Sequence, residues 1–302
     1  MNGLGNSDDI VAPPPRTLTT TIASGAAALW RWPKLAFAGA LLLALMLAAI
    51  FAPLLPLRDP YAQDLVLRLL PPFWHAGSDP QFLLGTDLLG RDNLSRLIYA
   101  ARVSLLVGFL AVGLAAVIGT VLGLVGGYFG GRIDAIVLFA INVRLGIPIM
   151  LVALAVVAVR GGTLGTLILI LGGLLWDRFA VVVRSATIRE TAKEYVQASR
   201  TFGSSHVYIM LWEILPNVAG PLIVVATFEV AHAILLEASL SFLGLGVSPP
   251  TPTWGTMMSE GKDLIFFDAW VIALPGAALF GLLLIVNVIG DQLRDILARD
   301  MG

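Results

Sequence analysis

The sequence contains no cysteine among its 302 residues. Disulfide frameworks, thiolate metal sites and cysteine nucleophiles are therefore excluded together. Charge is also scarce, because charged residues make up 13% of the chain, against about 25% in an ordinary soluble domain. The 19 Lys and Arg are balanced by 20 Asp and Glu, so the chain lacks the excess of cations that nucleic acids attract. Binding to nucleic acid is not expected.

Apolar residues are what the chain has in abundance, at 58% of the sequence with a mean hydropathy of +0.88. Spanning a bilayer takes about 20 apolar residues in a helix. The sequence thus predicts an all-α integral membrane protein. The first hydrophobic stretch is longer than the apolar region of a signal peptide, so we expect it to be retained. The six expected spans are residues 35–55, 103–125, 133–159, 164–183, 218–236 and 269–289.

Lys and Arg gather on the side of the membrane where the N-terminus lies, which favours a cytoplasmic location for both termini. Residues 1–28 include Pro13, Pro14 and Pro15 and have few large apolar side chains, so they predict a flexible cytoplasmic tail. Trp30 and Trp32 then suit the membrane–water interface. Residues 29–302 form the expected transmembrane domain, in which residues 56–102 are a long segment on the outer side.

A polar segment, residues 187–217, separates the fourth and fifth expected spans. Two capping-box patterns, Thr187 to Glu190 and Thr191 to Glu194, predict the start of a helix. Gly203 is a natural C-terminal cap, and Ser204 or Ser205 predicts a second short helix that ends at Pro216 and Asn217. The expected arrangement is helix, tight turn, helix.

The run Glu194 to Gly203, followed by Leu215, Pro216 and Asn217, resembles the EAA loop of ATP-binding-cassette importer permeases. Gln197 and Ser199 stand where that motif has Glu and Ala. The resemblance implies that this helix docks on a separate ATPase, while its exposed face could instead pack on the chain's own helices. The implied coupling residues are Glu194, Tyr195, Gln197, Ala198, Ser199, Phe202, Gly203, Leu215 and Pro216.

Further blocks, Leu84 to Asp92, Ser95 to Tyr99, Glu237 to Gly246 and Pro249 to Gly255, are similar to the second, or C-type, permease subunit of dipeptide, oligopeptide and nickel importers. The resemblance implies a type I ABC importer permease fold in the bacterial cytoplasmic (inner) membrane and import of di- or oligopeptides by alternating access. Nickel is the alternative cargo. The implied partners are a second homologous permease in a heterodimer, two ABC ATPase subunits and a periplasmic or lipid-anchored solute-binding protein, with membrane lipid around them.

No Walker A loop is present, because Gly255 lies one residue too far from Gly261-Lys262 and Asp263 replaces the Ser or Thr. We therefore expect a non-catalytic subunit without a cofactor, with ATP and Mg on the partner ATPases. The three histidines have no ligand-like spacing, so no metal site is expected. An ion-coupled secondary transporter is the alternative from another class, although the internal repeats typical of such proteins are not evident.

Ionisable residues within spans are costly and normally face protein or water. Arg144 could pair with Asp177, and Glu229 lies three residues before His232 on one helix face. These groups could line a pathway for zwitterionic cargo or could pair within the bundle. The candidates are Arg144, Asp177, Arg178, Glu229 and His232.

The long outer segment predicts a docking surface for a delivery protein, with a lid over the helix ends as the alternative. The candidate docking residues are Gly85, Thr86, Asp87, Arg91, Asp92, Pro249, Pro250 and Trp254. A stripe of small residues, Gly119, Gly123 and Gly127, lets another helix approach the second span closely. That helix could belong to the same chain or to a partner permease.

Overall fold

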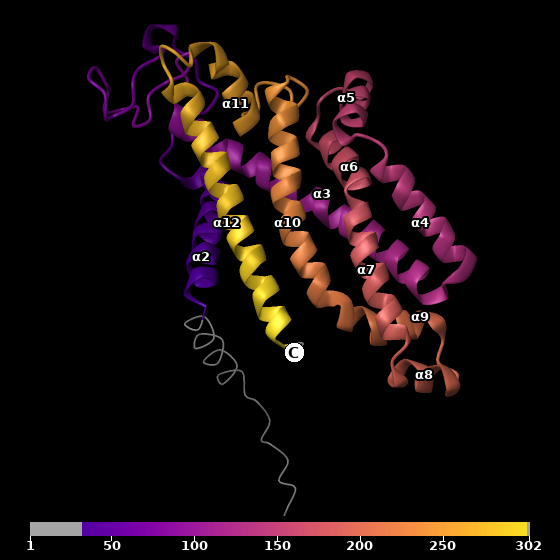
Figure 1. Ribbon diagram of the computed structural model, residues 1–302. Coiled ribbons are helices and arrows are strands. Elements are labelled where there is room, and N and C mark those ends of the chain that lie inside the picture. Colours follow the sequence, from indigo (N-terminus) through magenta and orange to yellow (C-terminus); the bar gives the residue numbers. More distant parts are fainter. Residues whose placement is uncertain (1–31, 301–302) are drawn as a thin grey trace, which may run out of the picture.

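The structure is a computed structural model that describes residues 32–300; the predicted tail of residues 1–28 and Trp30 lie outside this range. The described chain is helical and has no strand, which confirms the all-α prediction (Figure 1). Its α-helices are α2 (Pro33–Ile50), α3 (Asn93–Phe129), α4 (Gly131–Leu145), α5 (Ile149–Arg160), α6 (Leu164–Leu174), α7 (Trp176–Thr191), α8 (Glu194–Thr201), α9 (His206–Tyr208), α10 (Leu215–Phe242), α11 (Trp254–Gly261) and α12 (Trp270–Asp300).

Five helical stretches of the described chain are long and apolar enough to cross a membrane, or six if α4 and α5 count as one span. The third expected span, residues 133–159, is divided between two helices, because α4 and α5 meet at a bend of 77°. Pro148 lies at this bend and disfavours the helical conformation of the residue before it. The fourth span is also interrupted, at Leu175, and continues to Thr191 rather than ending at residue 183.

Two other spans begin earlier than predicted. Helix α3 starts at Asn93, inside the segment expected to be a loop up to residue 102, because the Asp92 carboxylate caps it by accepting the Ser95 N–H at 2.9 Å. The short helix expected to end at Pro216 instead runs on from His206 to Phe242. A π-helical stretch, Ile209–Ile214, precedes Pro216, which has no N–H to donate to the preceding turn.

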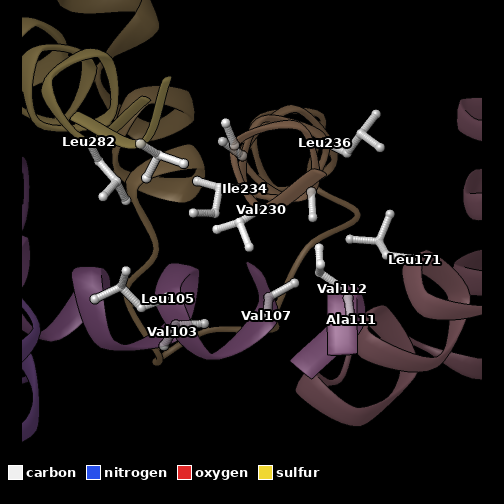
Figure 2. Packing of buried hydrophobic residues seen from close by; sticks show 14 of the residues in the cluster. Val103, Leu105, Val107, Ala111, Val112, Leu171, Val230, Ile234, Leu236 and Leu282 are labelled. Atoms are coloured by element: carbon white, nitrogen blue, oxygen red, sulfur yellow. The ribbon is translucent and has the colours of Figure 1, made fainter. Parts of the chain in front are cut away.

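Helix α3 is the centre of the bundle and contacts α2, α4, α6, α7 and α10. The stripe of Gly119, Gly123 and Gly127 faces α7, which shows that the close neighbour belongs to the same chain. A Cβ atom at each glycine would lie 2.4–2.8 Å from a carbonyl oxygen of α7. Figure 2 shows the neighbouring apolar core, where α3, α6, α10 and α12 contribute Val107, Val112, Leu171, Ile234 and Leu282, among others.

The bundle has two distinct ends (Figure 1). At one end, which we call the α8 end, lie the start of α2, the last described turn of α12 and the helix α8. At the opposite end, the α11 end, lie α11 and the segment that joins α2 to α3. The described chain therefore starts and finishes at the same end as the polar segment that resembles a coupling loop.

Candidate functional site

Helix α8 starts at Glu194, after Lys193 in an extended conformation and without a side-chain cap. Neither predicted capping box forms, because α7 continues through Thr187 to Thr191, where the Thr191 hydroxyl donates to the Ile188 carbonyl at 2.9 Å. Gly203 does end α8 as predicted, with φ of +82°. The Ser204 N–H bonds the Ser199 carbonyl and the Gly203 N–H bonds the Arg200 carbonyl, both at 3.1 Å, which is the Schellman arrangement.

One apolar side chain anchors α8 to the bundle. Val196 is fully buried and packs in a cluster with Val183 of α7, Ile209 and Ile214 of the π-helical stretch, and Leu124 of α3. Because α8 has only this one buried side chain, its remaining surface is left for polar contacts or for a partner.

The two departures from the EAA motif both hold α8 in place. The Gln197 amide donates to the Thr191 carbonyl at 2.8 Å, a bond that an ionised Glu could not make because it has no donor. The Ser199 hydroxyl lies 2.5 Å from Glu213 Oε1 and 2.9 Å from the Ser204 hydroxyl, where Ala would leave the carboxylate without this donor. Both substitutions thus fit the local structure.

Tyr195 connects α8 to both neighbouring helices. Its hydroxyl donates to Glu190 Oε2 of α7 at 2.8 Å and accepts from the Asn217 amide of α10 at 3.3 Å. Partial burial, followed by the hydrogen bond to the Glu190 carboxylate, raises the pKa of Tyr195 to about 12. Tyr195 therefore has a structural role within this chain, while its ring remains partly exposed and available to a partner.

The outward face of α8 is apolar at the positions predicted to contact a partner. Phe202 is 88% exposed, Tyr195 is 39% exposed, and Ala198 is exposed between them. Pro216 is exposed nearby, whereas Leu215 is half-buried. A large phenyl ring held in solvent beside a short helix is the kind of anchor that helix-in-groove recognition uses.

A second set of contacts ties this segment to the end of α3 and was not predicted. The Tyr128 hydroxyl lies 2.9 Å from His206 Nδ1, and the Arg200 guanidinium stacks over the Tyr128 ring at 4.5 Å. Tyr128 lies just beyond the second expected span, residues 103–125, and no role was predicted for it from the sequence. No sequence pattern indicates this contact, because 78 residues separate Tyr128 from His206 and only the fold brings α9 against the end of α3.

Arg144 pairs with Asp177 as predicted, with Nη2 and Oδ1 3.8 Å apart, and both residues are buried. The guanidinium also donates to the Ile147 carbonyl at 3.3 Å and to the Leu174 carbonyl. These carbonyls lie at the two helix interruptions, α4–α5 and α6–α7. Arg144 therefore stabilises both interruptions and is occupied by protein contacts.

Arg178, Glu229 and His232 form a separate group. Arg178 Nη1 lies 2.7 Å from Glu229 Oε1, and His232 Nδ1 lies 3.3 Å from Glu229 Oε2. Glu229 is buried, whereas 58% of the Arg178 side chain is exposed. Arg178 borders an open pocket of about 420 Å³, which α4, α7 and α10 line. The structure therefore brings the five predicted intramembrane residues into two ion-paired groups. Both groups contribute to the lining of this cavity, the first through Asp177 and the second through Arg178 and Glu229.

At the α11 end, most predicted docking residues are buried. Gly85, Thr86, Asp87, Arg91, Asp92 and Trp254 are inaccessible in this conformation, and only Pro249 and Pro250 remain exposed.

The buried charges at this end form an ion network instead. Arg91 lies 2.6 Å from Asp87 and 2.8 Å from Glu260, and Arg96 contacts the same two carboxylates. Glu260 and Arg96 were missed in the sequence, because Glu260 follows Arg96 by 164 residues and only the fold brings α11 onto α3. The network joins the segment before α3 to α11. A docking role is left to Pro249 and Pro250 as a prediction.

Among the described residues, no group of three or more His, Asp or Glu side chains could hold a metal ion.

Comparison with known proteins gives consistent matches. The family described as "Binding-protein-dependent transport system inner membrane component" matches residues 119–302. The dipeptide transport system permease protein DppC of Haemophilus influenzae is 40% identical over 85% of this chain and 87% of its own. The di/tripeptide permease protein DppC of Pseudomonas aeruginosa is 40% identical over 85% of this chain and 84% of its own. The probable D,D-dipeptide transport system permease protein DdpC of Escherichia coli is 35% identical over 92% of this chain and 93% of its own.

Among solved structures, a chain of the MetNI methionine ABC transporter in inward-facing conformations is similar in fold, with a TM-score of 0.54. The match covers 67% of this chain and 96% of that chain at 20% identity. At this level of identity the likeness concerns the fold alone.

Proposed function

Because this chain belongs to the family of binding-protein-dependent transport system inner membrane components, we propose that it is the permease subunit of an ATP-driven importer of short peptides. The observation that carries the proposal is 40% identity to dipeptide permeases over 85% of the chain. The named relatives are peptide permeases, which favours peptides over nickel as cargo. Membership of this family also argues against an ion-coupled secondary transporter.

The exposed face of α8 supports the coupling role. Phe202 and Ala198 present apolar surface at one end of the bundle, on a helix held by Val196 from the inside. Docking of an ATPase on this face would transmit its movement into α7 and α10, since Tyr195 bonds residues of both helices. Such a subunit works by alternating access, in which the nucleotide state of the ATPases changes the relative stability of two orientations.

We propose the following assembly around this chain. A second homologous permease completes the pathway as a heterodimer, and two ABC ATPases dock at the α8 end, where they bind ATP and Mg. A periplasmic or lipid-anchored solute-binding protein delivers peptide at the α11 end. The chain lies in the bacterial cytoplasmic membrane with both termini in the cytoplasm, which is consistent with the placement of α2, α8 and the end of α12 at one end of the bundle.

Reconstitution tests this function. The complex of both permeases and the ATPases is placed in liposomes, and uptake of a labelled dipeptide is measured with and without ATP and the solute-binding protein. We expect uptake only when both are present. Uptake by this chain alone, driven by an ion gradient, would contradict the proposal.

A further inference from the structure

Arg178 occupies an unusual position for a cation, near the middle of the helical stretch Leu164–Thr191, which is apolar enough to span a membrane. A charged side chain at this depth normally faces protein or a water-filled cavity, not lipid. Here it borders the open pocket beside α10, with apolar walls that include Val181, Val225 and Phe228. The pocket volume of about 420 Å³ falls in the range of about 300–1,000 Å³ that is usual for small-molecule sites.

The guanidinium of Arg178 is only partly used within the described chain. Of its five N–H donors, the contact with Glu229 engages Nη1, and 58% of the side chain remains exposed. Glu229 fixes the position of the guanidinium from the buried side, since only 1% of the Glu229 side chain is exposed. The remaining donors of the planar fork suit a carboxylate, which can accept two parallel hydrogen bonds.

The other charged groups around the pocket are already occupied. Both oxygens of Glu229 have partners, Arg178 and His232, and the buried Asp177 pairs with Arg144. Of the charged groups that line the cavity, Arg178 is therefore by far the most exposed to an incoming molecule. Its free N–H donors favour an acceptor group such as a carboxylate at this position.

We propose that Arg178 is a binding residue of the pathway that receives the C-terminal carboxylate of the peptide during translocation. This inference rests on the proposed function, because it identifies where the cargo is contacted inside the membrane. Glu229 already neutralises most of the charge of Arg178, so the cargo carboxylate has to share the guanidinium. Binding is accordingly weak and reversible, as passage through the site requires.

Saturation-transfer NMR on the complete permease–ATPase complex in nanodiscs, without the solute-binding protein, tests this site. The probes are alanyl-alanine and its C-terminal amide, in the nucleotide-free complex and in the complex trapped with ATP. We expect the free carboxylate to bind about tenfold more tightly than the amide in at least one of the two states, as the loss of a charge-assisted hydrogen bond predicts.

Two variants separate recognition from structure. Arg178→Gln alone leaves a buried carboxylate without its cation, so the informative variant is Arg178→Gln with Glu229→Gln, which keeps the site neutral. We expect this double variant to lose the preference for the free carboxylate while its affinity for the amide is unchanged. The matched control is Arg189→Gln, which removes an exposed arginine of α7 outside the pocket and should preserve the preference.

Equal binding of both probes by the unmodified complex, no binding in either state, or a preserved preference in the double variant would each overturn the inference. Failure of the proposed function is a different result, namely that the unmodified complex imports no dipeptide with ATP and the solute-binding protein present. A complex that imports dipeptide but shows no carboxylate preference refutes the role of Arg178 alone.

Discussion

Replacement of Phe202 by alanine should weaken ATPase docking without affecting the fold. Phe202 is 88% exposed, so the chain itself loses little packing, and its stability should change by no more than about 0.5 kcal/mol. If a groove of the ATPase covers this ring, burial of a Phe contributes about 1.5–3 kcal/mol. A loss of about 2 kcal/mol corresponds to roughly thirtyfold weaker binding.

The matched control is Val196→Ala on the buried face of α8, the helix that Phe202 directly follows. Val196 is fully buried, and removal of two methyl groups costs about 1.6 kcal/mol, with a further term for the cavity. This variant should lower the thermal midpoint of the permease while it retains Phe202 for docking.

The assay measures both properties for both variants, as ATPase affinity for the permease pair in nanodiscs and as thermal unfolding of the permease. The two variants should give opposite patterns. The reasoning is refuted if Phe202→Ala binds the ATPase as tightly as the unmodified chain, or if it loses as much thermal stability as Val196→Ala.

Three further predictions concern contacts seen in the structure. Ser199→Ala removes the donor to Glu213, whose other carboxylate oxygen is buried without a partner among the described residues. We expect the local stability of α8 to fall by about 1–3 kcal/mol. Unchanged hydrogen exchange in α8 would argue against this expectation. Arg144→Gln leaves Asp177 buried and unpaired at a cost of about 3–5 kcal/mol, and Arg144→Met with Asp177→Leu should recover part of the thermal stability; a double variant as unstable as the single one contradicts the pairing. The raised pKa of Tyr195 means that folding favours its neutral form. The contribution of Tyr195 to the free energy of unfolding is therefore complete below about pH 10 and is lost as the pH rises through about 12. Ultraviolet titration should show a late ionisation that is missing in Tyr195→Phe.

The sequence predicted the existence of the apolar spans better than their shape. Runs of apolar residues reveal that a segment can cross a bilayer, but the bend between α4 and α5 adds no polar residues that would interrupt such a run. Pro148 was available as a signal for this bend, whereas Leu175, at the interruption of the fourth span, gives none.

The polar segment illustrates why local motifs can mislead. A Thr followed three residues later by Glu predicts a helix start only if the preceding chain is not already helical, and at Thr187 α7 continues without interruption. By contrast, the end of α8 at Gly203 was predicted correctly, because the cap needs a positive φ, here +82°, which glycine adopts without steric cost.

Candidate site residues were predicted with equally uneven success. The Arg144–Asp177 pair followed from the cost of burying a charge within a span. The role of Glu260 could not be inferred, because its partners lie more than 160 residues earlier in the sequence. Arg91 directly precedes α3, and Arg96 lies in the first turn of that helix. Burial of the predicted docking residues likewise depends on how α11 packs against α3.

The most direct test of the account is a measurement on Ala198, at the exposed face of α8. Since the sequence has no cysteine, Ala198→Cys introduces the single thiol of this chain. The rate of modification by a membrane-impermeant maleimide is measured in the permease pair with and without bound ATPases. The account predicts rapid modification without the ATPases, strong protection with them, and loss of peptide uptake once the thiol is modified. Equal modification rates, together with normal uptake by the modified complex, would contradict the claim that α8 is the surface through which ATPases drive transport.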